Sequence, residues 1–211
     1  KQGNAALRSQ TRVEQHGSIV SRQGGVLLQT KDKVTQTGET VAKGDVQYLA
    51  KNIEVKSGAL VAAGVTVQDT TQGEIRSLDT QHAQGANLTL SAEKTISSKA
   101  KHLASGEINV RAETVDLSNS QLSGDSIALQ SAQSALNLNK TTLYSEGKTT
   151  LSNPNLISTE NAHLNADHFV VDSVQLNNHQ GSWIQRGAEV FALNLQKGLD
   201  NTEGKIVAEG T

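Results

Sequence analysis

The chain has 211 residues, a formal net charge of −2, five aromatic residues, one Pro, no Met and no Cys. The missing Cys excludes disulfides and thiolate chemistry, and no run of about 18 apolar residues could span a bilayer as a helix. The balanced charge argues against a nucleic-acid-binding protein, which needs a basic face. Ser, Thr, Asn and Gln supply about a third of the residues and charged residues 19%. The chain therefore resembles neither an aromatic-rich enzyme nor a disordered protein.

Glycine recurs along the chain at a nearly constant spacing. If the gap between Gly147 and Gly187 counts as two steps, the mean spacing is about 21 residues. The recurring glycines are Gly24, Gly44, Gly64, Gly85, Gly106, Gly124, Gly147, Gly187 and Gly210.

A tripeptide of an aliphatic residue, any residue and a small residue forms a second column with the same period. Clear copies begin at Ile19, Leu60, Leu103, Leu122, Leu143, Leu164 and Ile206, and weaker copies begin at Thr40, Gln81 and Ile184. Together these copies predict about ten repeats.

Each glycine is followed by a short segment in which apolar and polar side chains alternate, which is typical of a strand with one buried face. In chain order, the expected inward residues include Val26/Leu28/Thr30, Val46/Tyr48/Ala50, Val65/Val67, Leu88/Leu90/Ala92, Ile108/Val110/Ala112 and Ile127/Leu129/Ser131. A middle pair follows in several repeats, at Ile53/Val55, Val115/Leu117, Leu136/Leu138 and Val174/Leu176.

Two or three short strands per repeat, without helical periodicity, predict an all-β solenoid: a parallel β-helix with three faces and about ten coils of about 21 residues. Ten coils at one strand spacing each would make a rod about 48 Å long. A leucine-rich repeat and a β-sandwich are the alternatives. The leucine-rich pattern is not present in register, and Gly24-Gly25-Val26 does not continue into the calcium β-roll repeat.

The last coil carries a more specific motif, at Leu199, Asp200, Asn201, Gly204, Ile206, Ala208 and Gly210. This coil resembles the haemagglutinin repeat of filamentous haemagglutinin-like exoproteins, in which L-D-N-x-x-G-x-I-x-A-x-G recurs. That family includes large adhesins and the stick proteins of contact-dependent growth-inhibition systems. Earlier coils keep the hydrophobic pattern but lack Leu-Asp-Asn, as in Val115-Asp116-Leu117.

The resemblance implies a right-handed β-helix within a much longer fibre, secreted through the two-partner pathway to the bacterial cell surface. It also implies an outer-membrane secretion partner and a receptor, protein or glycan, on a target cell. Since the chain begins with Lys1 and shows no signal peptide, we expect residues 1–211 to be a single β-helix segment of such a fibre.

Candidate catalytic and metal-binding residues are sparse. Glu93 and Glu113 lie about one repeat apart, as paired carboxylates of a carbohydrate-active β-helix enzyme would. Their neighbours favour a solvated face instead. We likewise interpret His163 and His168, near Asp167, as solvated turn residues. We expect no enzyme activity, no catalytic residue, no cofactor and no metal, and we interpret His82 as part of an irregular coil.

Aromatic residues gather towards the end of the chain. Trp183 with Arg186 is a candidate receptor contact, because exposed Trp and Arg are common in binding hot spots. Alternation points Tyr144 outward, which makes it a third candidate. The structural alternative has Phe169 and Phe191 stacking inside a wider coil while Trp183 covers a loop.

Two segments, Asn87-Leu88-Thr89 and Asn139-Lys140-Thr141, have the form of N-glycosylation sequons. They matter only where the producing cell has a suitable transferase.

The sequence therefore favours a structural and adhesive role: a shaft segment of a secreted surface filament that mediates or displays cell contact. Two other functions stay open. The segment could itself be the receptor-binding module, or it could be a carbohydrate-active lyase or hydrolase.

Overall fold

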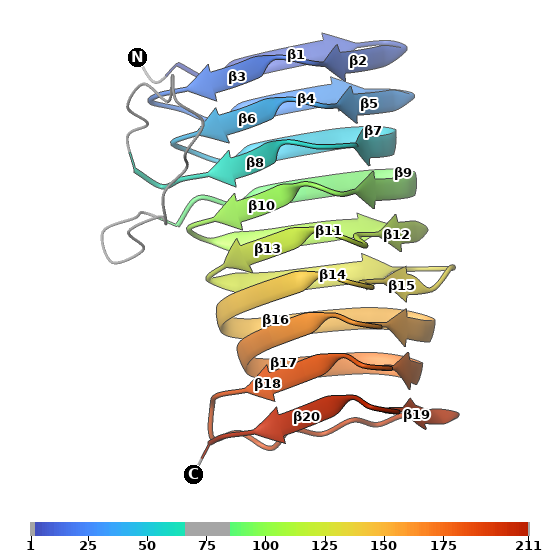
Figure 1. Cartoon of the computed structure of the whole chain (residues 1–211). Coiled ribbons are helices and arrows are strands. Elements are labelled where there is room, and N and C mark those ends of the chain that lie inside the picture. Colours follow the sequence, from blue (N-terminus) through green and yellow to red (C-terminus); the bar gives the residue numbers. More distant parts are fainter. Residues whose placement is uncertain (1–2, 66–84, 211) are drawn as a thin grey trace.

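The computed structural model describes residues 3–65 and 85–210, which form an all-β coil without a helix (Figure 1). Parallel strands about 21 residues apart stack into about nine turns. Four long strands bend around corners of the coil and join its three faces into one continuous sheet of 20 strands: β7 (Val46–Val55), β9 (Leu88–Ser98), β16 (Thr142–Ser158) and β17 (His163–Asn177).

Every printed strand pairing in the sheet is parallel, and each face of the coil stacks one strand segment per turn. The first face contains β1 (Ala5–Ser9), β4 (Val26–Thr30), β7 (Val46–Val55), β9 (Leu88–Ser98), β11 (Glu107–Ala112), β14 (Ser126–Ser131), β16 (Thr142–Ser158) and β17 (His163–Asn177). The second face adds β2 (Arg12–Gln15), β5 (Lys33–Gln36), β12 (Thr114–Asp116), β15 (Leu136–Asn137) and β19 (Gly198–Asp200). The third face adds β3 (Ser18–Ser21), β6 (Glu39–Ala42), β8 (Ala59–Ala62), β10 (Lys101–Ala104), β13 (Gln121–Gly124), β18 (Ser182–Gln185) and β20 (Lys205–Ala208).

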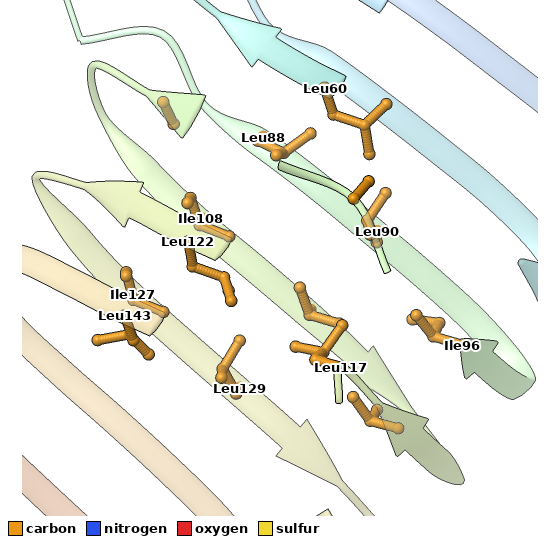
Figure 2. Close-up of a cluster of buried hydrophobic side chains, with 14 of the residues drawn as sticks. Leu60, Leu88, Leu90, Ile96, Ile108, Leu117, Leu122, Ile127, Leu129 and Leu143 are labelled. Carbon is orange, nitrogen blue, oxygen red and sulfur yellow. The ribbon is translucent and has the colours of Figure 1, made fainter. Parts of the chain in front are cut away.

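The interior is a set of aliphatic columns, one residue per coil. Figure 2 shows inward side chains of neighbouring coils lying one above another, among them Leu88, Ile108 and Ile127 from the first face. These side chains are at most 1% exposed. Burying such a side chain contributes roughly 1.5–3 kcal/mol, so the columns and the backbone ladders together hold the coils in register. The expected alternation of buried and solvent-facing residues is confirmed here.

Residues 3–65 and 85–210 form about nine turns, where the repeats predict about ten. Strand β7 pairs directly with β9, in the register Val46↔Leu88, and β8 pairs directly with β10, in the register Leu60↔His102. Two coils that lie two periods apart in sequence are therefore neighbours in the stack. The copy of the repeat expected at Gln81–Ala83, with His82, lies outside the described residues.

In two copies of the tripeptide column, the expected register was wrong by one residue. The structure places His102 and Trp183 inside, in line with Leu122 and Leu164, while Leu103 and Ile184 lie on the outer side. Both errors have one cause: the inward residue is not aliphatic, and the next residue along the chain is. Of the middle pair expected at Val174/Leu176, Leu176 is inward as expected, whereas Val174 is only partly buried and the second inward position is Asn178, two residues after Leu176.

The Leu-Asp-Asn motif is explained by the turn between the second and third faces. Leu199 continues a column with Leu176, and Asp200 begins the turn, because its Oδ1 accepts a hydrogen bond from the Thr202 backbone N–H at 2.9 Å. That hydrogen bond lowers the pKa of Asp200. Asp116, Asn137 and Asn177 accept the equivalent bond in earlier coils, so the same turn recurs in coils that the motif does not match.

The third motif residue, Asn201, lies next to Asn178 of the preceding coil. The Asn178 Nδ2 donates to Asn201 Oδ1 at 2.7 Å, and the Asn201 Nδ2 donates to the Gly204 carbonyl at 3.3 Å. Gly204 is required there because an added Cβ would overlap the Asn178 carbonyl. Ile206 is partly buried against the core, whereas Ala208 and Gly210 are exposed. Asp200, Asn201 and Gly204 thus build one corner of the last described coil, and β20 follows it.

Candidate functional site

The outer side of the third face carries the candidate contact residues Tyr144 and Arg186. Tyr144 lies on β16 between two buried residues and is 38% exposed, so the expected outward direction is confirmed. Arg186 follows β18, two coils further along the stack, and its guanidinium carbon lies 4.7 Å from the centroid of the Tyr144 ring. The two candidates therefore meet on one surface, as a cation–π pair.

Arg186 also binds the backbone at an irregularity in the coil. Its guanidinium donates to the carbonyl oxygens of Ser145 at 2.7 Å and Glu146 at 3.1 Å, and to Asn165 Oδ1 at 2.8 Å. The pairing of β16 with β17 shifts register between Ser145 and Lys148, so these carbonyls lie where the regular ladder is interrupted. One side chain thus joins three successive coils.

The chemistry of this surface follows from those contacts. The Arg186 guanidinium is held against its own chain by hydrogen bonds and by the Tyr144 ring. The exposed part of Tyr144, with Glu146 and Asp167 exposed beside it in sequence or register, remains open to solvent. The surface could offer an aromatic ring and carboxylates to a partner, while Arg186 positions the ring.

Trp183 is not on this surface, so the expectation that it contacts a receptor needs correction. Its side chain is fully buried, and its Nε1 donates to Thr159 Oγ1 at 3.0 Å. The indole lies 4.9 Å from the Phe169 ring and 6.1 Å from the Phe191 ring. The expected stacking of Phe169 and Phe191 is confirmed at 5.5 Å, and Trp183 joins them inside the coil because its column position faces inward.

A histidine that the sequence did not single out lies in the core. His102 is fully buried; Nε2 lies 2.9 Å from Ser98 Oγ, and Nδ1 lies 3.2 Å from the Gln121 carbonyl oxygen. Burial lowers the pKa of His102 to about 4. The signal that could have found it was its spacing: His102 falls about one period before Leu122, in an inward position.

The carboxylate pair considered for an enzyme is not arranged as a pair. Lys94 Nζ binds both carboxylate oxygens of Glu113, at 2.9 and 3.0 Å, and Glu93 is exposed. Strand β9 shifts register by one residue relative to the next coil here, so Lys94 rather than Glu93 reaches Glu113.

The histidines near Asp167 also differ from the expectation. His163 is exposed, but both histidines belong to β17 rather than to a turn. The His168 side chain is 19% exposed, and its Nε2 lies 3.3 Å from Glu189 Oε2. Within residues 3–65 and 85–210, no three His, Cys, Asp or Glu side chains gather as metal ligands.

A groove of about 540 Å³ follows the corner between the third and first faces of the early coils. Gly24, Gly44, Gly64 and Gly85 line it, so the glycine column read from the sequence marks this corner. Arg8, Lys43 and Asp45 place charges of both signs on its walls.

Comparisons with known proteins give one informative match. The chain is 26% identical over 123 residues, or 58% of its length, to a Yersinia pestis protein named Toxin CdiA. The matched part is 4% of that relative, so the chain spans a small fraction of its length. No family model matches the chain, and no solved structure does. No helix long and apolar enough to cross a membrane occurs in the described part of the chain.

Proposed function

We propose that this chain is a shaft segment of a secreted bacterial surface filament that mediates or displays contact with another cell. The observation that carries the proposal is the continuous stack of parallel coils, because such a stack makes a rod with one nearly identical unit per turn. Its similarity to Toxin CdiA and the haemagglutinin-like motif at Leu199–Gly210 support the same assignment.

The proposal places the protein outside the cell that makes it, with an outer-membrane secretion partner and a target-cell receptor that is a protein or a glycan. It assigns no role in nucleic-acid binding, which the net charge of −2 supports. It also assigns no catalytic residue: of the two carboxylates considered, Glu113 forms an ion pair with Lys94 and Glu93 points to solvent.

An in-register deletion in the full-length protein tests the shaft role. Lys101 pairs with Gln121, so deleting residues 101–120 removes one coil and rejoins equivalent positions. We expect surface display and contact with target cells to be retained, since a shaft works with one unit fewer. The control, deletion of residues 101–110, breaks register and should abolish display.

Surface labelling of intact producing cells and a contact assay are the measurements. Retained display with lost contact after deletion of 101–120 would contradict a plain shaft, and a filament found only inside the cell would contradict the proposal altogether.

A second candidate, a receptor-binding module on the third face, is favoured by the exposed Tyr144 ring that Arg186 positions. The Tyr144→Ala variant separates the two functions. A shaft keeps full cell contact with this variant, whereas a receptor-binding module loses it at unchanged surface display.

A further inference from the structure

The outer side of the first face carries few charged residues. Its strand segments stack along the rod (Figure 1), and the residues between the inward positions form two outward columns of eight residues each, with one residue per coil. One column runs from Ala6 to Val170, and the other runs from Arg8 to Asp172. Within these two columns, Arg8, Arg111 and Asp172 are the charged residues, and no residue is buried.

The other two faces of the rod are not equivalent to the first. On the third face, the outward residues Val41 and Val61 are already buried, in a small cluster apart from the core. On the second face, charged outward side chains occur in several coils, at Arg12, Lys33, Glu54, Asp116 and Asp200. The first face is therefore the open and weakly charged side of the described rod, so a partner that covers it removes few charges from water.

The size of the first face indicates what kind of partner fits it. Its strands reach six residues in β11 and β14. Eight coils at about 4.8 Å each, with strands of about 20 Å, give an outer surface of about 750 Å². A standard protein–protein interface buries about 800 Å² per partner, so a stable partner has to cover the face along its whole length. A second copy of the rod has that length and the same spacing between coils.

The charges at the two ends of the face select the orientation of the second copy. Arg8 lies in the first coil and Asp172 in the eighth, in one column. If the two rods run antiparallel, with the two-fold axis along the strands, Arg8 faces Asp172 of the second copy, and symmetry forms this pair twice. In the same arrangement Val170 faces Ala6 of the second copy. A parallel pair would bring each column against the other, so that Arg8 would face Ala6 and no opposite charge.

The side chains that this pairing uses are available. Val170 is 41% exposed. Arg8 Nε donates to Gln29 Oε1 at 3.2 Å, and neither Arg8 nor Asp172 forms an ion pair within residues 3–65 and 85–210. Arg111, the third charged residue, faces the fourth coil of the second copy, which carries the exposed Glu93. Each charge of the two columns therefore meets an opposite charge across the pair.

We propose that two copies of this rod associate antiparallel through the outer sides of their first faces, with Arg8 of each copy paired to Asp172 of the other. The surface is mostly polar and of modest area, so the dimer is reversible and dissociates below roughly micromolar concentration. The inference does not rest on the proposed function, because it concerns the isolated chain in solution.

Sedimentation velocity of the folded chain over a range of concentrations tests the pairing. Arg8→Asp and Asp172→Arg should each raise the dissociation constant about tenfold or more, because each places like charges together twice. The double variant Arg8→Asp/Asp172→Arg restores opposite charges across an antiparallel pair and should restore association. Lys101→Glu, an exposed charge reversal on the third face, is the control and should leave association unchanged. Circular dichroism checks that every variant is folded.

Cysteine crosslinking reads the orientation directly, because the chain has no Cys of its own. With a short bismaleimide, a mixture of Ala6→Cys and Val170→Cys chains should give covalent dimers, whereas either chain alone should give few. Efficient crosslinking of Val170→Cys to itself would show a parallel pair and overturn the proposal. A chain that stays monomeric up to about 100 μM, or a double variant that does not recover association, would overturn it as well.

Discussion

At the scale of single residues, the interior accepts polar side chains wherever the coil supplies a partner. The Tyr48 hydroxyl bonds Thr40 Oγ1 at 2.7 Å and also donates to Gln36 Oε1, and burial raises the pKa of Tyr48. The Trp183 Nε1 donates a hydrogen bond to Thr159 Oγ1, and the Asn178 Nδ2 donates one to Asn201 Oδ1. Satisfied polar groups of this kind cost little, so the columns continue through them.

His102 makes the stability of the rod depend on pH. Its pKa is about 4 in the folded state and 6.5 in the unfolded state. As the pH falls from 6.5 to 4, the unfolded chain binds a proton that the folded chain does not, so stability present above pH 6.5 is lost. The loss amounts to about 3 kcal/mol across this window.

Urea unfolding of the native chain and of His102→Leu, from pH 7.5 to pH 4, measures this effect. The difference between the two unfolding free energies should change by about 3 kcal/mol over that range, since the remaining titratable groups are common to both. A difference independent of pH would show that His102 is not held neutral in the core.

At the scale of elements, one corner of the coil depends on stacked glycines. Gly17, Gly38 and Gly58 lie one above another between the second and third faces. A Cβ on Gly38 would overlap the Gly17 carbonyl, a Cβ on Gly58 would overlap the Gly38 carbonyl, and Gly58 also has a φ of +93°. Gly17, at the end of the row, has nothing within 4 Å of an added Cβ.

Gly58→Ala should therefore destabilise the fold by about 3 kcal/mol or more, from the overlap and the unfavourable φ together. Gly17→Ala is the matched control and should change stability by no more than about 0.5 kcal/mol. Denaturant unfolding monitored by circular dichroism gives both values. Equal effects of the two substitutions would mean that the coils are not stacked in this register.

Some strands can be predicted from the sequence and others cannot. Strands with two aliphatic residues, such as β11 with Ile108 and Val110, are predictable because alternation alone sets their direction. The register of β10 and β18 could not be predicted in this way, because their inward positions are occupied by His102 and Trp183, which a search for aliphatic residues does not detect. The repeated Asx turn was missed for a related reason: its Asp or Asn varies from coil to coil, and only the hydrogen bond is constant.

At the scale of the whole molecule, the period of the sequence predicted the architecture and came within about one of the number of turns that the described residues form. A count of periods includes every repeat-like segment, whereas the stack includes only segments that pair. The pairing Val46↔Leu88 shows that one period is passed over, and no local pattern near Gly64 or Gly85 marks this. The candidate contact surface was predictable in part. Alternation predicts the outward direction of Tyr144, but no sequence pattern predicts that the Arg186 side chain contacts two neighbouring coils.

The distance between the two ends of the stack is the most direct test of the claim that the coils form a parallel rod. Ser18 and Lys205 are exposed ends of one column that passes through Glu39, Ala59, Lys101, Gln121, Thr142, His163 and Ser182. The chain has no Cys, so Ser18→Cys and Lys205→Cys can carry spin labels for double electron–electron resonance. Eight steps of about 4.8 Å predict a single distance of ~38 Å. A distance near ~43 Å would restore the tenth coil, and one below about 25 Å would contradict the rod.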